Sequence, residues 1–386
     1  MHSEMEMLRC AIVRGGTSKG IFIMANELPA DPVQRDKVLL AIFGSPDIRQ
    51  IDGLGGADIL TSKLAIIAPS SRTDADVDYT FGQISTTEAF VDYGGNCGNI
   101  SSAVGCFAID MGLVKPVEPL TRVRIHMTNT NRILTAEIPV KNGKAAVEGD
   151  CSIDGVPGTG ARITLDWSDA VGGITGSLLP TGSAKDTVSA GGKDYTVSVV
   201  DAGNIVIFIN AGEFGLTGTE TPAAIEADNA LMQLIEEIRG KVCQQLGLVK
   251  NWQDAASQTP YQPFFAMVSP PSDHSCFNGV KVRQADVDIV SRLLFMLHMH
   301  KAYPITGTVA TGAAARIPGT VVNELLAETA RQSVLLRIGH PSGVIPVEAA
   351  ASVQNDQVTI ERIGVYRTAR MIMEGHVYVR KSVFGK

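Results

Sequence analysis

Two segments, one in each half of the chain, run from a loop of small polar residues into an apolar helix, and this repetition constrains the fold most. In the first, GGNCGN (94–99) precedes apolar residues at helical spacing from Ile100 to Met111, and Gly112 predicts the helix end. In the second, ITGTVATGAAARIPGTVVNELL (305–326) runs from a Gly/Thr-rich loop into a helix. The sequence therefore predicts an internal repeat, with one strand, glycine loop and helix in each half.

The length of 386 residues exceeds what one ordinary hydrophobic core organises, which predicts two domains. The segment LLPTGSAKDTV (178–188) is typical of a connection between halves. We therefore expect an N-terminal domain over 1–184 and a C-terminal domain over 185–386, with the C-terminal strand crossing back. The formal net charge of −7 gives no indication of nucleic-acid binding, so we expect no nucleic-acid partner.

Neither the apolar runs nor the cysteines indicate a membrane or secreted protein. No apolar run reaches membrane-spanning length, and MHSEMEMLRC at the start lacks the apolar core of a signal peptide. The six cysteines match neither a disulfide framework nor a metal knuckle: they lie at positions 10, 97, 106, 151, 243 and 276. We expect a reduced, cytoplasmic protein that binds no metal and no membrane.

The remaining elements are predicted from apolar periodicity and turn residues. We predict strands over 8–16, 63–69, 77–84, 122–129, 195–200, 205–209 and 263–271, and helices over 31–44, 222–247 and 287–303. His298 and His300 are two residues apart in the last of these helices, so they point to different faces. That is poor geometry for a zinc site, and both histidines are predicted to lie in the core or on the surface.

Two side chains in polar motifs are candidates for acid–base chemistry. Cys97 is predicted at or just before a helix N-terminus, where free N–H groups and the helix dipole favour a thiolate or a bound carboxylate. Lys63 follows Thr61 and Ser62 at the start of a predicted strand. Each has a simpler interpretation: Cys97 as a small core residue and Lys63 as a solvated charge at a strand edge.

The loops that end the strands repeatedly contain Gly, Ser, Thr and Asn, as in RGGTSKG (14–20). Such loops display backbone N–H groups and hydroxyls, which are the donors that bind carboxylates. The spacing of a phosphate loop is absent, and so are the dinucleotide fingerprint, HExxH and GxSxG. The chemistry that remains is proton transfer, with a lysine or a thiol as the acid–base group.

Long motifs spread from Arg14 to about Val379 resemble the PrpF family of isomerases. The motifs are RGGTSKG, IDGLGGADILTSKLAII, DVDYTFGQ, GGNCGNIS, DGVPGTGA, ARIPGTVVN, RIGHPSGVIPV and RTARMIMEGHVYV. The resemblance implies an α+β, diaminopimelate epimerase-like fold with two similar domains, each a β-barrel-like sheet around a central helix, and an active site between them. It also implies that no metal or cofactor is needed.

The resemblance assigns the catalytic pair to Lys63, in the TSK motif, and Cys97, in the NCGN motif. The ITGTVATG segment has threonines where epimerases of this fold carry a second cysteine, which argues against two-thiol racemisation. The polar loops and helix starts, predicted at 98–100 and near 311–312, supply candidates for substrate binding. These are Thr17, Ser18, Ser62, Asn96, Gly98, Asn99, Ser269, Lys301, Thr306, Thr308, Thr311 and Gly312.

The implied activity is movement of a proton across the C=C bond of an unsaturated di- or tricarboxylic acid, as an allylic 1,3-shift or a cis–trans isomerisation. Such an acid is the small-molecule partner we expect. GSPDIRQIDGL, GTETP, SRLLFM and HKAY resemble family members that isomerise methylitaconate more than those acting on 2-methylaconitate or 4-oxalomesaconate. Those two acids remain alternatives; a tricarboxylate would need another cation, from Arg14, Lys301 or Arg316. A non-catalytic small-acid-binding protein is the alternative of a different class. A homo-oligomer is left open.

Overall fold

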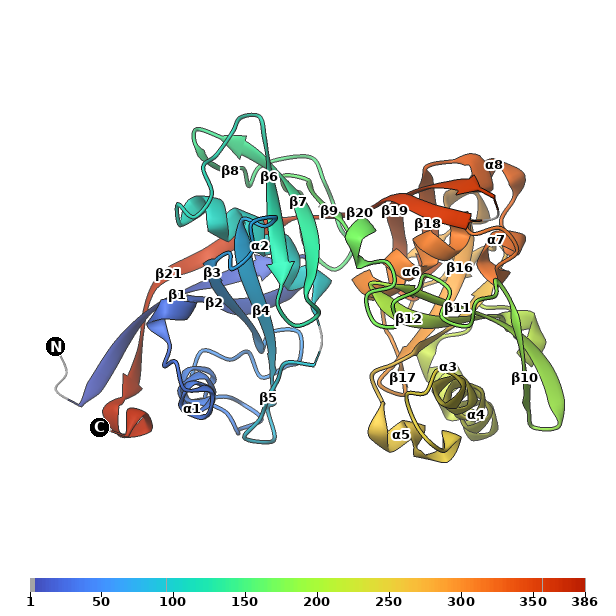
Figure 1. Cartoon of the computed structure of the whole chain (residues 1–386), viewed down its shortest axis with the longest axis horizontal. Helices are drawn as coiled ribbons and strands as arrows, with labels where there is room; N and C mark the ends of the chain where they lie inside the picture. The colour runs from blue at the N-terminus through green and yellow to red at the C-terminus, as the bar shows by residue number, and fades with distance from the viewer. Residues whose placement is uncertain (1–3, 95, 356, 386) are drawn as a thin grey trace. The chain divides into compact units, whose positions relative to one another are not determined.

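The computed structural model describes residues 4–94, 96–355 and 357–385 and divides into two compact units (Figure 1). Unit 1 is Met1–Leu165 with Tyr366–Lys386, and unit 2 is Asp166–Val365. The sequence predicts the boundary after residue 184, some way beyond the division of these units. Residues 166–184, between the two boundaries, are rich in Gly and Ser, as linkers are. They nevertheless form a hydrogen bond to the strand β11 (Lys193–Ala202), where Gly172 N donates to the Asp201 carbonyl at 2.8 Å.

Unit 1 contains most of the elements that carry the sequence motifs. Its strands are β1 (Met5–Gly15), β2 (Ser18–Met24), β3 (Lys63–Pro69), β4 (Val77–Ile84), β5 (Val91–Asp92), β6 (Leu120–Met127), β7 (Arg132–Lys141), β8 (Lys144–Ala145), β9 (Ile163–Asp166) and β21 (Ala369–Arg380). Its helices are α1 (Pro32–Phe43), α2 (Gly98–Asp110), and the 3-10 turns η1 (Ala25–Glu27) and η6 (Lys381–Phe384). The strands predicted in this part of the chain are confirmed.

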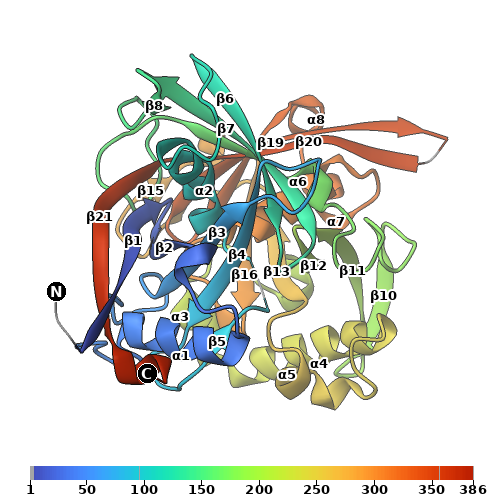
Figure 2. The ribbon, with the colours of Figure 1, turned by 60° about the vertical axis from the view of Figure 1, so that its left-hand side comes forward.

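Helix α2 is the centre of unit 1. It packs against β1, β2, β3, β6, β7, β8 and β21 (Figure 2). Every one of its residues except Asn99 and Asp110 is buried. The apolar positions from Ile100 onward therefore face strands on nearly all sides, rather than along one stripe. The predicted helix after GGNCGN is confirmed, and Cys97 is its N-cap residue.

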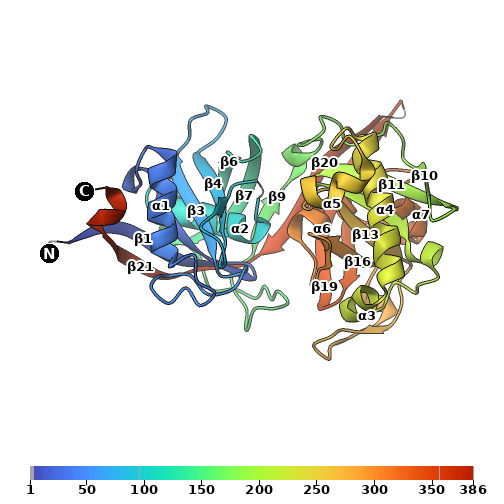
Figure 3. The ribbon, with the colours of Figure 1, turned by 90° about the horizontal axis from the view of Figure 1, so that it is seen from below.

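Helix α1 has the boundaries that its local sequence predicts. The Asp31 side chain accepts a hydrogen bond from Gln34 N at 2.8 Å, and Pro32 occupies the first helical position. Gly44 ends the helix with φ of 72°, a conformation that glycine adopts without strain. The helix lies beside η6 near the C-terminus, where Gln34 Nε2 donates to the Val383 carbonyl (Figure 3).

Unit 2 repeats this combination of strands and helices. Its strands are β10 (Asp186–Ala190), β11 (Lys193–Ala202), β12 (Asn204–Asn210), β13 (Phe264–Ser269), β14 (His274–Ser275), β15 (Lys281–Val282), β16 (Ile289–Phe295), β17 (His298–Met299), β18 (Leu335–His340), β19 (Gly343–Gln354) and β20 (Gln357–Arg367). Its helices are α3 (Pro222–Ala227), α4 (Asn229–Gln245), α5 (Ala255–Gln258), α6 (Ile305–Arg316), α7 (Val321–Leu325) and α8 (Glu328–Gln332), with 3-10 turns η2 (Ser168–Ala170), η3 (Ala211–Phe214), η4 (Trp252–Asp254) and η5 (Gln284–Asp286).

The order of strand pairings in unit 1 recurs in unit 2. In unit 1 the pairs β1–β2, β3–β4 and β6–β7 are antiparallel, whereas β2–β3 and β4–β6 are parallel. In unit 2 the pairs β11–β12, β13–β16 and β18–β19 are antiparallel, whereas β12–β13 and β16–β18 are parallel. Helices α2 and α6 occupy equivalent places in this order, so the predicted internal repeat is confirmed.

The predicted helix over 287–303 is wrong, because these residues form β16, β17 and their connections. Strand β16 pairs with β13 on one side and with β18 on the other. All of its residues except Phe295 are buried, so apolar side chains occur at consecutive positions. Such a run has no period of two and resembles a buried helix in sequence. The long-range pairings decide its structure.

The predicted loop over 305–312 is also wrong, because these residues form the first turns of α6. The Thr308 hydroxyl donates to the Pro304 carbonyl at 3.0 Å, and the Thr311 hydroxyl donates to the Gly307 carbonyl at 2.8 Å. Threonine hydroxyls can favour loops by competing for backbone groups, but here these two hydroxyls bond to carbonyls one turn earlier in the same helix. Because every residue of α6 is buried, small side chains are selected for packing rather than for flexibility.

The single helix predicted over 222–247 is divided into α3 and α4 at Asp228. The Asp228 carboxylate accepts a hydrogen bond from Leu231 N at 3.0 Å, so it caps the second helix and ends the first. Among the residues that the structure describes, no helix combines the length and apolar character needed to cross a bilayer.

Candidate active site

Lys63 begins β3 and is only 9% exposed. Its ammonium Nζ donates to Gln83 Oε1 at 2.9 Å and lies 5.4 Å from the centre of the Phe81 ring. Within the described ranges, no carboxylate forms an ion pair with Lys63. The neutral amide and the aromatic face thus hold Nζ in place at the start of β3.

A glycine brings the Lys63 strand close to the start of α2. Gly20 of β2 pairs with Lys63, and a Cβ added at Gly20 would lie 2.7 Å from the Lys63 carbonyl oxygen. The same Cβ would lie 3.1 Å from Ile100 Cδ1, in the first turn of α2. The missing side chain therefore lets the first turn of α2 pack against the strand that carries Lys63.

Cys97 precedes α2 in an extended conformation, and its side chain forms no capping hydrogen bond. Its carbonyl accepts from Ser101 N at 2.8 Å and from the Ser101 hydroxyl at 2.9 Å. The thiol is half-buried. Gly98 is the first helical residue, so the N–H groups of the first turn are left without a side-chain cap and suit an anion.

Asn99 joins three motifs that are far apart in the sequence. Its Nδ2 donates to the Thr17 hydroxyl at 3.0 Å, and its Oδ1 accepts from Arg367 Nε at 3.0 Å. Gly16, with φ of 50°, passes so close that an added Cβ would lie 2.1 Å from Asn99 Oδ1. RGGTSKG, NCGN and RTAR therefore converge at the N-terminus of α2.

The turn between β6 and β7 supports the NCGN loop. Asn129 Oδ1 accepts from Phe81 N at 2.8 Å, and its Nδ2 donates to the Phe81 and Tyr93 carbonyls at 2.9 and 2.8 Å. The neighbouring Thr130 hydroxyl accepts from Asn96 Nδ2 at 3.0 Å. One turn thus connects the strand under the Lys63 ammonium to the residues that precede Cys97.

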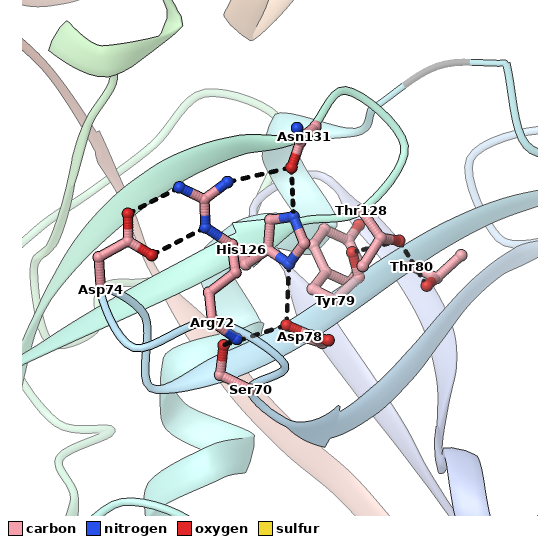
Figure 4. Close-up of polar contacts among 9 residues, drawn as sticks. All are labelled: Ser70, Arg72, Asp74, Asp78, Tyr79, Thr80, His126, Thr128 and Asn131. Carbon is pink, nitrogen blue, oxygen red and sulfur yellow. Dashed lines mark hydrogen bonds and ion pairs between the residues drawn. The ribbon is translucent and has the colours of Figure 1, made fainter.

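A polar network fixes this turn from its other side (Figure 4). The two ring nitrogens of His126 lie 2.9 Å from Asp78 Oδ1 and 3.0 Å from Asn131 Oδ1. Arg72 donates to the same Asn131 oxygen at 3.0 Å and pairs with Asp74. Burial alone would raise the pKa of Asp78, but hydrogen bonds from Ser71, His126 and Ser70 outweigh it and lower that pKa.

The other predicted residues of unit 1 lie around these groups. The Ser18 hydroxyl and Asn96 Oδ1 are buried and have no hydrogen-bond partner in the part of the chain that the structure describes. The Ser62 hydroxyl instead donates to Gln50 Oε1 at 2.7 Å. Ser18 and Asn96 thus retain hydrogen-bonding capacity for a ligand, whereas the Ser62 proton is already engaged.

The candidates on α6 do not line a helix start as predicted. The helix begins at Ile305, so Thr311 and Gly312 lie in its middle, and the expected N-terminus at these residues is wrong. The hydroxyls of Thr308 and Thr311 are bonded within the helix. Thr306, at the second helical position, is 8% exposed and is the threonine nearest the true N-terminus.

Ser269 and Lys301 are the remaining predicted residues of unit 2. Ser269 ends β13 and is buried, and its hydroxyl has no partner within the described residues. Gly218, with φ of 83°, covers it, since an added Cβ would lie 2.2 Å from Ser269 Oγ. Lys301 is exposed, and its carbonyl accepts from the Ser342 hydroxyl.

Four residues of the unit 1 site were not predicted from the sequence: Gln83, Asn129, Thr130 and Arg367. Gln83 lies in the DVDYTFGQ motif, and its place in that motif was the sequence signal for it; in the structure it pairs with Lys63 across β3 and β4. Arg367 is the first residue of RTAR, within one of the motifs shared with the PrpF family. Across the described ranges, no cluster of three or more His, Cys, Asp or Glu side chains could hold a metal ion.

Comparison with known proteins places this site in a family. The family model described as PrpF protein matches residues 5–380. The 3-methylitaconate isomerase of Eubacterium barkeri is 53% identical over 381 residues, covering 98% of this chain and 99% of the relative. The 2-methyl-aconitate isomerase of Shewanella oneidensis and the 4-oxalomesaconate tautomerase of Pseudomonas putida are each 39% identical, covering 96% and 97% of both chains, respectively.

Solved structures agree with these sequence matches. The crystal structure of a methylitaconate-delta-isomerase has a TM-score of 0.92 and 53% identity, covering 99% of this chain and 98% of that one. A hydroxyproline epimerase from Agrobacterium vitis, at 11% identity and TM-score 0.53, shares the fold alone and covers 98% and 93% of the two chains. Fold and relatives define an isomerase of the α+β epimerase-like class. The chain belongs to the PrpF family.

Proposed function

We propose that this isomerase shifts the double bond of an unsaturated dicarboxylic acid of the methylitaconate type by moving one proton. The observation that carries the proposal is the buried Lys63 ammonium, held by an amide and an aromatic ring beside the first turn of α2. The 53% identity to a 3-methylitaconate isomerase over nearly the whole chain supports the substrate class.

Neutral Lys63 Nζ takes the proton from the carbon that lies between a carboxylate and the C=C bond. The electron pair of that C–H bond becomes part of a dienolate that extends over the alkene and the carboxylate. Lys63, or Cys97 as the second acid–base group, then returns a proton to the far alkene carbon. The double bond has moved by one position, and atoms and charge balance without an oxidant or a cofactor.

The negative charge that develops on the dienolate needs donors already in place. The uncapped N–H groups at the start of α2 provide them, together with the dipole of a 13-residue helix. The Thr17 hydroxyl is oriented by Asn99 Nδ2 at 3.0 Å. These groups need little rearrangement during the reaction, which is the property that makes electrostatic stabilisation effective.

The three cations considered for a third carboxylate have contacts that favour a dicarboxylate substrate over a tricarboxylate. Arg316, considered for a third carboxylate, is buried and donates to four backbone carbonyls. Arg14 donates to the Gly16 and Thr368 carbonyls at 2.9 Å. Lys301 is exposed. None of these three residues presents a preformed buried site for an additional carboxylate.

Deuterium incorporation tests the proposal and separates it from its alternatives. The protein, in D₂O with EDTA and no added cofactor, is incubated with methylitaconate, 2-methylaconitate and 4-oxalomesaconate, and exchange is followed by NMR. We expect exchange and double-bond migration with methylitaconate at the highest rate. A higher rate with either other acid would reassign the substrate, and binding without exchange in any acid would support the non-catalytic alternative.

A further inference from the structure

Arg367 carries a positive charge that no side chain in the described ranges neutralises. The residue is 7% exposed and lies where β20 ends. Its Nε donates to Asn99 Oδ1 at 3.0 Å, and one terminal nitrogen donates to the Tyr366 carbonyl at 2.6 Å. A guanidinium has five N–H groups. Three of them therefore lack an acceptor among the residues that the structure describes.

The other buried arginines are better satisfied. Arg239 forms a two-pronged pair with Glu236 and also donates to two carbonyls. Arg316 donates to four carbonyls, and Arg292 donates to three. Buried cations in this protein are thus normally surrounded by acceptors. Arg367 departs from that pattern beside the first turn of α2, where it bonds to Asn99.

Among the residues that the structure describes, no carboxylate forms an ion pair with Arg367. Burial lowers the pKa of Arg367 to about 10, and the groups that oppose this shift are the thiols of Cys151 and Cys97. A buried charge without a partner is costly, and pairing with an anion removes most of that cost. The hydrogen bond to Asn99, two residues after Cys97, places the guanidinium near the proposed reaction centre.

Two further features prepare the same region for an anion. Ser18 is only 2% exposed, and its hydroxyl has no hydrogen-bond partner in the described ranges. It follows Thr17, whose hydroxyl is bound by Asn99, the residue that also orients Arg367. Gly16 makes room for the arginine stem, since an added Cβ would lie 3.0 Å from Arg367 Cδ.

We propose that Arg367 binds one carboxylate of the substrate through two parallel N–H groups, beside the N-terminus of α2. The free donors of its guanidinium match the two oxygens of a carboxylate, and the geometry is held by Asn99. The inference rests on the proposed function, because it assigns the recognition of that same dicarboxylic acid.

Substitutions combined with substrate esters test this assignment. Arg367→Met and Arg367→Lys are compared with Arg370→Met, which changes an exposed arginine on β21. The substrates are methylitaconate and its two monomethyl esters. We expect Arg367→Met to raise KM for the diacid at least about 30-fold, with a smaller change in kcat, because a buried charge pair is lost. Arg370→Met should resemble the wild type.

The esters identify the carboxylate. The wild type should reject one monoester strongly, and Arg367→Met should no longer distinguish that ester from the diacid. Arg367→Lys keeps the charge but not the paired donors, so it should fold and give an intermediate KM. Wild-type KM in Arg367→Lys and Arg367→Met, or unchanged rejection of both esters in Arg367→Met, would overturn the assignment.

A binding measurement keeps this inference separate from the proposed function. Calorimetric titration of methylitaconate into the wild type and Arg367→Lys requires no turnover. Weaker binding in the variant supports Arg367 even if no acid exchanges deuterium, in which case only the proposed isomerisation fails. Equal binding in both proteins contradicts Arg367 even if the wild type is an active isomerase. If Arg367→Met does not fold, Arg367→Lys and the two esters decide.

Discussion

The Lys63 side chain is buried with a neutral amide at 2.9 Å as its hydrogen-bond partner, and the proposed function makes it the base. Lys63→Ala should therefore lower kcat by more than tenfold, about 1.4 kcal/mol of barrier, and leave the thermal unfolding midpoint nearly unchanged. Steady-state kinetics and circular dichroism measure the two effects. Lys141→Ala, at an exposed lysine of β7, is the matched control. Retention of more than a tenth of wild-type activity in Lys63→Ala would reject Lys63 as the base.

Cys97 is half-buried directly before α2, and under the proposed function it either transfers a proton or shapes the anion site. Cys97→Ser keeps the size of the side chain and a donor but replaces an acidic thiol by a weakly acidic hydroxyl. We expect kcat to fall roughly ten- to a thousandfold, less than for Lys63→Ala. Wild-type rates in Cys97→Ser would restrict Cys97 to packing.

Alkylation provides a second measurement on the same thiol. Iodoacetamide should inactivate the wild type with modification at Cys97, mapped by mass spectrometry, and a bound dicarboxylate should protect it. The residual activity of Cys97→Ser should not respond to the reagent. Inactivation of that variant at the wild-type rate would assign the effect to another cysteine.

At the scale of elements, the contact between β1 and α2 depends on a glycine. A Cβ added at Gly15 would lie 2.3 Å from the Asn99 carbonyl oxygen and 3.2 Å from Ala103 Cβ, so the helix start must move. We expect Gly15→Ala to lower the free energy of unfolding by about 1–3 kcal/mol and to reduce kcat/KM. Urea unfolding and kinetics measure both.

Gly375→Ala on the paired strand β21 is the control for this substitution. Its added Cβ would approach only the sulfur of the flexible Met373 side chain, at 3.2 Å. It should change stability and activity little. Equal effects of the two substitutions would show that strand glycines matter here for general reasons, and not because α2 must lie against β1.

The stability of the whole molecule should depend on pH through a buried histidine of unit 2. Burial lowers the pKa of His274 below its ordinary 6.5, Arg292 acts in the same direction, and the carbonyls of Ser272 and His340 with Asp273 oppose the shift. The unfolded chain therefore takes up this proton at higher pH than the folded chain. Stability contributed by neutral His274 is present above about pH 6.5 and is lost as the pH falls below it.

His274→Gln should flatten that dependence. Urea unfolding between pH 7.5 and 5.5 should show stability falling with pH in the wild type and falling less in the variant. His376→Gln, at an exposed position of β21, should keep the wild-type slope. The same slope in His274→Gln as in the wild type would contradict a role for this histidine.

Local signals were sufficient for the elements whose structure depends on neighbouring residues. The Asp31 cap, Pro32 and Gly44 define α1, because a capping bond depends on residues close together in the sequence. The alternation of side chains in 77–84 defines β4, because successive residues of a strand point to opposite faces. The helix after Cys97 follows in the same way. Together with the family motifs, these signals also identified Lys63 and Cys97 as the candidate pair.

Tertiary structure alone decided the segments whose residues are buried on every side. The run over 289–295 is a strand because β13 and β18 pair with it. The segment 305–312 is helical, and its small side chains allow every one of its residues to be buried. The same reasoning explains why Gln83, Asn129 and Arg367 were missed. Their roles arise from contacts between residues distant in sequence, such as Arg367 with Asn99, and no local period encodes such a contact.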